Sequence, residues 1–160
     1  MPDTLDDLTH ALVDAARKAG AGAADAIAMR GQSVIVDMRG GTLEQAERAE
    51  GVDIGLRVLV GRRQANVSAS DNRPETIAAL AERAGAIARE APEDPFAGLA
   101  DAAQLSVRRD AAGLDLCDPG PVPAPDALMR MAEEAEAAAL RVAGVAKVQS
   151  ASAAWSRREM

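Results

Sequence analysis

The chain has 160 residues, a formal net charge of -7 and a sequence pI near 4.7. This length suits one domain and leaves no room for a multidomain enzyme. The acidic balance disfavours nucleic-acid binding, no stretch approaches the roughly 20 apolar residues of a membrane span, and the acidic first residues differ from a signal peptide. We therefore expect a cytoplasmic protein with no direct nucleic-acid partner and no membrane partner.

The composition predicts a thin hydrophobic core. Alanine accounts for 38 residues, whereas the chain has one Phe, one Trp and no Tyr. A buried alanine removes little apolar surface from water, and the aromatic side chains that bury most area are nearly absent. We expect a marginally stable domain that is stabilised by contact with a neighbouring domain or subunit. When alone, it is expected to form a homodimer or weak oligomer.

The N-terminal part of the chain predicts a helix followed by a hairpin. Residues 4–19 place leucines and alanines at helical spacing, and Thr4 with Asp7 can form a capping box. Two short apolar runs, 24–30 and 33–39, are separated by Gly31 and Gln32, which predicts two strands joined by a turn.

The central part predicts a second hairpin. Apolar residues alternate with polar ones through 51–60, and a Gly61-Arg62-Arg63 turn leads to a second alternating run at 64–70. Between the two hairpins, the composition of residues 42–50 favours a helix, although strands are expected on both sides. From the residues alone, helix and strand are equally supported there.

The C-terminal part predicts two helices and an irregular connection. The first helix covers 74–91, with Pro74 in its first turn, and the second covers about 126–142. The second helix is expected to bury a face that contains Leu128, Met131 and Ala135. A strand could begin near residue 146.

These elements predict an α+β fold. We expect an antiparallel sheet of about four to five strands, two to three helices packed on one face, and an extended proline-rich connector. The expected organisation is an N-terminal domain core at 1–118, the connector at 119–125, and a helix and strand at 126–160 that lead to a further domain.

The residues that could carry chemistry form no catalytic or metal-binding pattern. His10 is the only histidine and Cys117 the only cysteine, so neither a catalytic triad nor a zinc motif can be built. His10 is expected on a solvated helix face and Cys117 in a half-buried packing position. Two glutamate groups are expected to be solvated: Glu44, Glu47 and Glu50, and Glu133, Glu134 and Glu136.

Several segments together resemble the TldD/PmbA family, also described as modulators of DNA gyrase. They are the Glu93-Asp94-Pro95-Phe96-Ala97-Gly98 run, the Leu114-Asp115-Leu116-Cys117-Asp118-Pro119 run, the Gly51-x-x-x-Gly55-x-Arg57-Val58 strand, the Gly61-Arg62-Arg63 turn, and the Ser68-Ala69-Ser70-Asp71 run. Their order matches the family, and the first two are closer to the PmbA (TldE) branch.

The resemblance implies the N-terminal domain of a longer bacterial protein. In this family the TldD subunit carries a zinc site and hydrolyses peptides, and the PmbA subunit pairs with it. The implied partners of this chain are a TldD-type metallopeptidase subunit and a peptide or unfolded protein. The chain itself is expected to hold no catalytic residue and no cofactor, with zinc in the partner subunit. The family also implies a strand at 42–50.

Four residues are candidates for partner or peptide contact: Arg57, Ser68, Phe96 and Trp155. Arg57 and Ser68 belong to the predicted hairpin, whose edge could accept an added strand or be covered by another domain. Phe96 and Trp155 could anchor another element or cover the domain's own core. The alternative function is a non-enzymatic, acidic protein-binding module.

Overall fold

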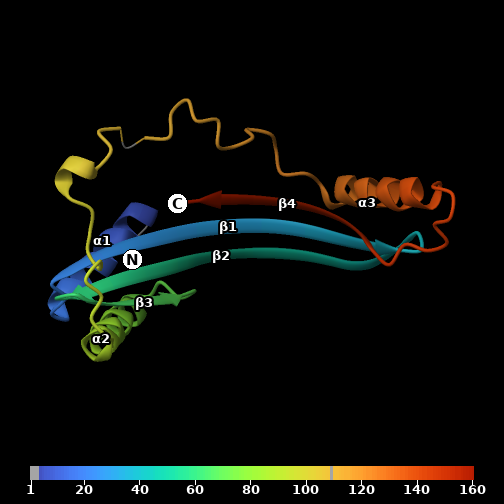
Figure 1. Ribbon diagram of the computed structural model, residues 1–160. Helices are drawn as coiled ribbons and strands as arrows, with labels where there is room; N and C mark the ends of the chain where they lie inside the picture. Colours follow the sequence, from blue (N-terminus) through green and yellow to red (C-terminus); the bar gives the residue numbers. More distant parts are fainter. Residues whose placement is uncertain (1–3, 109) are drawn as a thin grey trace. The chain divides into compact units, whose positions relative to one another are not determined.

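A computed structural model describes residues 4–108 and 110–160. The four strands form one antiparallel sheet in the order β3-β2-β1-β4, and three α-helices accompany it (Figure 1). The predicted α+β class is therefore confirmed. In chain order the elements are α1 (Leu5–Lys18), β1 (Ala23–Arg39), β2 (Thr42–Val60), β3 (Arg63–Ala69), α2 (Pro74–Glu90), η1 (Ala102–Gln104), α3 (Pro125–Leu140) and β4 (Ala151–Glu159).

The chain divides into two compact units, and strands β1 and β2 contribute to both. The first unit contains Met1–Arg30, Gly51–Asp110 and Glu159–Met160, and the second contains Gly31–Glu50 and Ala111–Arg158. Each unit has its own cluster of buried apolar side chains. The two units are described separately below.

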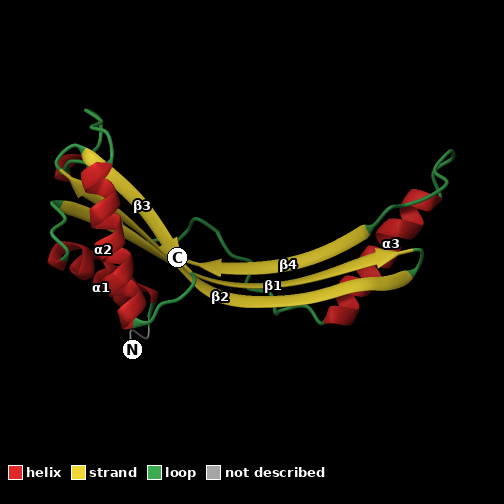
Figure 2. Cartoon of the chain, turned by 90° about the horizontal axis from the view of Figure 1, so that it is seen from below, coloured by secondary structure: helices red, strands yellow, loops and turns green. Residues whose placement is uncertain are grey.

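The core of the first unit lies between the sheet and two helices. Helices α1 and α2 lie side by side (Figure 2). Alternate residues of β2 are buried beneath them because successive side chains of a strand point to opposite faces. Leu8 and Leu12 of α1 are fully buried there, and much of the remaining core is alanine. Thr4 and Asp7 form the predicted capping box at the start of α1.

The core of the second unit is smaller. Val34, Val36 and Met38 of β1 pack with Leu128 and Ala132 of α3, and β4 adds an alanine. Helix α3 thus buries a stripe of residues four positions apart. The expected burial of Met131 and Ala135 is wrong, since both are exposed, Met131 with an exposed fraction of 60%. The third position of the buried stripe is Glu136.

Glu136 fixes the turn between β1 and β2. Its carboxylate accepts hydrogen bonds from the amides of Gly40, at 2.6 Å, and Gly41, at 2.8 Å. Both glycines have positive φ, 59° and 71°, as two-residue hairpin turns require. The expectation of a solvated Glu136 is therefore wrong: its exposed fraction is 4%, because the helix packs the carboxylate directly onto the turn.

Strands β1 and β2 are longer than predicted. The expected turn at Gly31 and Gln32 is absent: β1 runs unbroken through both residues, and Gly31 does not have the positive φ of the turn glycines. Residues 42–50 are extended, in agreement with the family resemblance and against their helical composition. Strand pairing with β1 overrides local propensity in this segment.

Strands β2 and β3 form the predicted second hairpin. Their register runs from Val60 opposite Arg63 to Ile54 opposite Ala69, and Gly61 in the turn has a φ of 60°. The remaining elements differ only at their ends: α3 begins at Pro125 and β4 at Ala151. The hairpin places Arg57 and Ser68 on neighbouring strands of the first unit.

Candidate interaction surfaces

The described residues contain no metal-binding or catalytic constellation. No group of three or more His, Cys, Asp or Glu side chains in this part of the chain could hold a metal ion, so the residues do not fit a zinc centre. His10 is exposed on α1, with Nδ1 3.6 Å from the Asp6 carboxylate. Cys117 is exposed and not half-buried as expected, because it lies in an irregular loop. No helix within residues 4–108 and 110–160 is long and apolar enough to cross a membrane.

Arg57 is held by an ion pair across the first unit's sheet. Its Nε lies 3.0 Å from Oδ1 of Asp25 on β1, and its Nη2 lies 2.5 Å from Oδ2. The hydrogen bonds to Asp25 raise the pKa of Arg57 above its usual value, so the guanidinium stays charged. About a third of the Arg57 side chain is exposed, which leaves part of it free to meet a partner.

A hollow of about 480 Å³ lies beside this ion pair on β1, β2 and β3. Gly55 lines it opposite Ile27, and a Cβ added to Gly55 would lie 2.9 Å from the Ile27 Cγ2 atom. A side chain at position 55 would therefore push Ile27 away from the sheet. Val67 and the exposed Asn66 complete the hollow on β3. The surface is partly apolar with one charged pair, a composition common at protein interfaces.

Ser68 lies on the edge strand of this unit. It is exposed and stands opposite Gly55 in the β2–β3 register. In an antiparallel ladder closed by a two-residue turn, alternate pairs exchange hydrogen bonds, so the Ser68 amide is directed away from β2. The β3 edge therefore offers backbone groups to an added strand.

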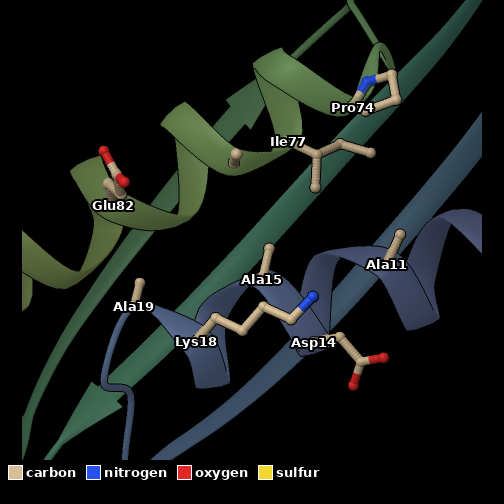
Figure 3. A pocket seen from close by; sticks show the side chains of 9 residues that line it. Ala11, Asp14, Ala15, Lys18, Ala19, Pro74, Ile77 and Glu82 are labelled. Carbon is tan, nitrogen blue, oxygen red and sulfur yellow. The ribbon is translucent and has the colours of Figure 1, made fainter.

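A second hollow, of about 410 Å³, lies between α1 and α2. Figure 3 shows Ala11 and Ala15 of α1, and Ala19 directly after it, facing Ile77 of α2. Lys18 and Glu82 lie at the rim. Small side chains keep this groove open, and its charged rim includes groups of both signs. Apart from the alanine spacing of the two helices, no pattern in the sequence indicates this groove.

Phe96 is displayed by a fixed turn. Its exposed fraction is 93%, and its amide donates a hydrogen bond to Oδ1 of Asp94 at 2.9 Å. The amide of Asp94 in turn donates to the carbonyl of Arg62 at 2.8 Å, which ties the turn to the β2–β3 hairpin. Phe96 therefore covers no part of the core of its own unit, and the anchor interpretation is favoured for it.

Trp155 has the opposite environment. It lies on β4, is half-buried and packs against the apolar cluster of the second unit. The Arg157 guanidinium lies 5.4 Å from the centre of the indole ring, and Nη2 of Arg157 donates to the carbonyls of Asp118 and Gly120. These contacts favour a local packing role for Trp155. The four candidate residues do not form one site.

Asp71, three residues before the start of α2, has a lowered pKa. Asp71 accepts hydrogen bonds from the Arg73 guanidinium and amide and from the Thr76 hydroxyl, and these hold the pKa of Asp71 well below its usual range. The folded state therefore keeps Asp71 ionised at pH values where the unfolded chain binds a proton.

We predict that Asp71 stabilises the fold at neutral pH and loses this effect as the pH falls below about 4, the ordinary aspartate pKa. The Asp71→Asn variant should unfold at lower urea concentration than the wild type at pH 7. The difference should shrink at pH 2.5. A constant difference between the two pH values would contradict this role of the carboxylate.

Comparison with known proteins identifies the class of domain. A family model described as PmbA/TldA metallopeptidase domain 1 matches residues 24–88. The chain is 36% identical over 108 residues to the metalloprotease PmbA of Escherichia coli O157:H7. The aligned region covers 68% of this chain and 23% of that protein.

Two crystal structures share the fold. One is a candidate modulator of DNA gyrase from Bacteroides thetaiotaomicron, with a TM-score of 0.69, 17% identity, and coverage of 96% of this chain and 34% of that one. The other is TldE from Thermococcus kodakarensis, with a TM-score of 0.68, 16% identity, and coverage of 94% and 34%.

The chain belongs to the TldD/PmbA family and corresponds to its N-terminal domain. The domain is of the PmbA/TldE metallopeptidase type. It spans about a quarter of the length of the curated relative and about a third of the two solved structures.

Proposed function

We propose that this chain is the N-terminal domain of a PmbA/TldE-type subunit of a heteromeric, cytoplasmic zinc metallopeptidase that acts on peptides or unfolded proteins. Its role is to provide scaffold, partner-binding surface and part of the wall of a substrate chamber. The observation that carries this proposal is the 36% identity to the metalloprotease PmbA. The missing metal-ligand cluster among the described residues is compatible with a non-catalytic role.

The proposed arrangement assigns different tasks to different parts of the chain. Residues 1–118 form the domain core, 119–125 form the connector, and 126–160 lead to a further domain. Zinc and the catalytic groups belong to a TldD-type partner subunit. Phe96, exposed on its fixed turn, and the Arg57–Asp25 pair are surfaces for protein contact.

We predict that the chain alone binds no stoichiometric zinc and cleaves no peptide. A zinc site needs three or four His, Cys, Asp or Glu ligands close together, and the described residues contain no group of three or more such side chains that could hold a metal ion. Metal analysis after dialysis, together with a fluorogenic peptide assay, tests this division of tasks. Zinc near one ion per chain, or cleavage without a partner subunit, would contradict it.

The β3 edge is the proposed contact for an unstructured peptide. Main-chain hydrogen bonds do not depend on the identity of the side chains, so strand addition suits a protease that accepts varied sequences. Ser68→Pro removes one outward amide, and we predict severalfold weaker peptide capture by the full complex with unchanged helix content by circular dichroism. Unchanged capture would show that this edge is covered by another part of the protein.

A non-enzymatic, acidic protein-binding module is the alternative function. The groove between α1 and α2 and the exposed Phe96 favour it, because an open groove and an exposed aromatic side chain suit contact with another polypeptide. The two functions differ in their dependence on a peptidase. An adaptor would bind its partner whether or not a TldD-type subunit is present.

A further inference from the structure

The first half of β2 is paired on one side only. The β2–β3 register ends at Ile54 opposite Ala69, and β1 occupies the other side of β2 in the sheet. Within the described chain, no strand therefore pairs with residues 42–50 on the side away from β1. We call these nine residues the β2 free edge. They span about 30 Å of extended backbone at roughly 3.3 Å per residue.

The side chains of the β2 free edge are exposed. Every residue from 42 to 50 is exposed, and these include Leu43, whose exposed fraction is 43%. Their composition favours a helix, yet the segment is held extended by β1 and by the turn that Glu136 fixes. A segment whose local preference conflicts with its fold is expected at functional sites.

The charges of the β2 free edge select the kind of strand that could join it. Three glutamates and one arginine give residues 42–50 a net charge of -2. Glu44 pairs with Arg39 and Glu50 pairs with Arg48, whereas Glu47 has no ion-pair partner in the described part of the chain. Oε2 of Glu47 accepts a hydrogen bond from the side-chain Nε2 of Gln45 at 3.3 Å.

We propose that the β2 free edge takes an extended polypeptide segment with Lys or Arg at alternate positions, which adds as a strand. Backbone hydrogen bonds to residues 42–50 would supply the affinity. Glu47 would supply the preference for cations, because strand alternation places it on the opposite face from Glu44, Arg48 and Glu50, and cations at alternate positions of the added strand share one face. A second copy of this edge is a poorer occupant, because residues 42–50 of each copy carry a net charge of -2. The proposal concerns residues other than the β3 edge and does not rest on the proposed peptidase role.

Titration of the chain with a fluorescent nine-residue peptide of alternating Lys and Val tests the proposal. We expect binding that weakens as NaCl rises from 50 to 500 mM, because salt screens exposed charges. A peptide of alternating Glu and Val should bind at least tenfold more weakly. The Lys-Val peptide with four consecutive N-methylated amides should lose binding, since it keeps its charges but cannot form the ladder.

Two matched variants locate the binding site. Glu47→Lys should weaken binding of the Lys-Val peptide about 3- to 10-fold, as expected when an exposed attraction becomes a repulsion. Glu134→Lys, the same charge change on the exposed face of α3, should bind as the wild type does. Circular dichroism of each variant checks that the fold is retained.

Several outcomes would overturn the proposal. Equal binding of the N-methylated peptide would mean charge attraction without strand addition, and equal binding of the acidic peptide would mean no charge selection. Loss of binding in Ser68→Pro, with none in Glu47→Lys, would place the peptide on β3 instead. Self-association that blocks the peptide and is weakened by Glu47→Lys would identify a second copy as the occupant.

Discussion

Leu12→Ala should destabilise the chain by about 2–5 kcal/mol, the range for truncation of a fully buried leucine. Leu12 has an exposed fraction of 0% and lies in the middle of α1 within the first unit's core. Many of its neighbours are alanines, which have no flexible side chains to move into the space that the truncation leaves. We therefore expect a value in the upper part of this range.

The effect of Leu12→Ala is large relative to the stability of the whole chain. Natural domains unfold with roughly 5–15 kcal/mol, and this alanine-rich core should lie at the low end of that range. Urea unfolding followed by far-ultraviolet circular dichroism measures the change. Ile87→Ala on α2 is a suitable control, because Ile87 is exposed. A loss below 1 kcal/mol for Leu12→Ala would show that this core is not what stabilises the unit.

Glu136→Gln should destabilise the second unit by about 1–3 kcal/mol, the cost of leaving a buried polar group without its partner. The glutamine has the same shape, but its amide nitrogen must face one of the two donors, Gly40 or Gly41, that the carboxylate now satisfies. The substitution thus removes one hydrogen bond and creates a donor facing a donor.

Trp155 provides a local signal for the Glu136→Gln experiment. It is the only tryptophan and packs against the apolar cluster of the second unit, so its fluorescence reports on that unit. Glu134→Gln, an exposed change on the same helix, should alter the unfolding free energy by less than about 0.5 kcal/mol. Equal stability of the two variants would mean that the carboxylate does not hold the turn.

The sequence predicts elements well where local chemistry and packing agree. The capping box at Thr4, the alternation of β2 from Ile54 to Val60, and the glycine turn at Gly61 each contain their own signal, and all are confirmed. These signals act within a few residues and need no distant partner. They were sufficient to predict the class of fold and the second hairpin.

The predictions were wrong where contacts between distant segments determine the local structure. Gly31 reads as a turn residue, but pairing along the whole of β1 keeps it in a strand. Glu136 reads as a solvated glutamate among others, and only its contact with a turn 95 and 96 positions away makes it buried. Such contacts depend on tertiary packing, which periodicity in a single sequence does not encode.

The sequence allowed the candidate contact residues to be chosen, but it did not predict the contacts that each of them makes in the structure. The β3 edge follows from a local motif, whereas the turn that exposes Phe96 was not predicted, and the ion pair of Arg57 requires Asp25, 32 positions away. Trp155 could be an anchor or a packing residue on sequence grounds, and its contact with the second unit's cluster favours packing.

Sedimentation velocity of this chain with the TldD-type subunit of the same organism tests the proposed role most directly. We predict that the chain alone forms a weak oligomer over a concentration series, and that it co-sediments with the partner subunit and gains thermal stability from it. A strictly monomeric chain that sediments independently of the partner, with an unchanged melting temperature, would contradict a role as a metallopeptidase-subunit domain.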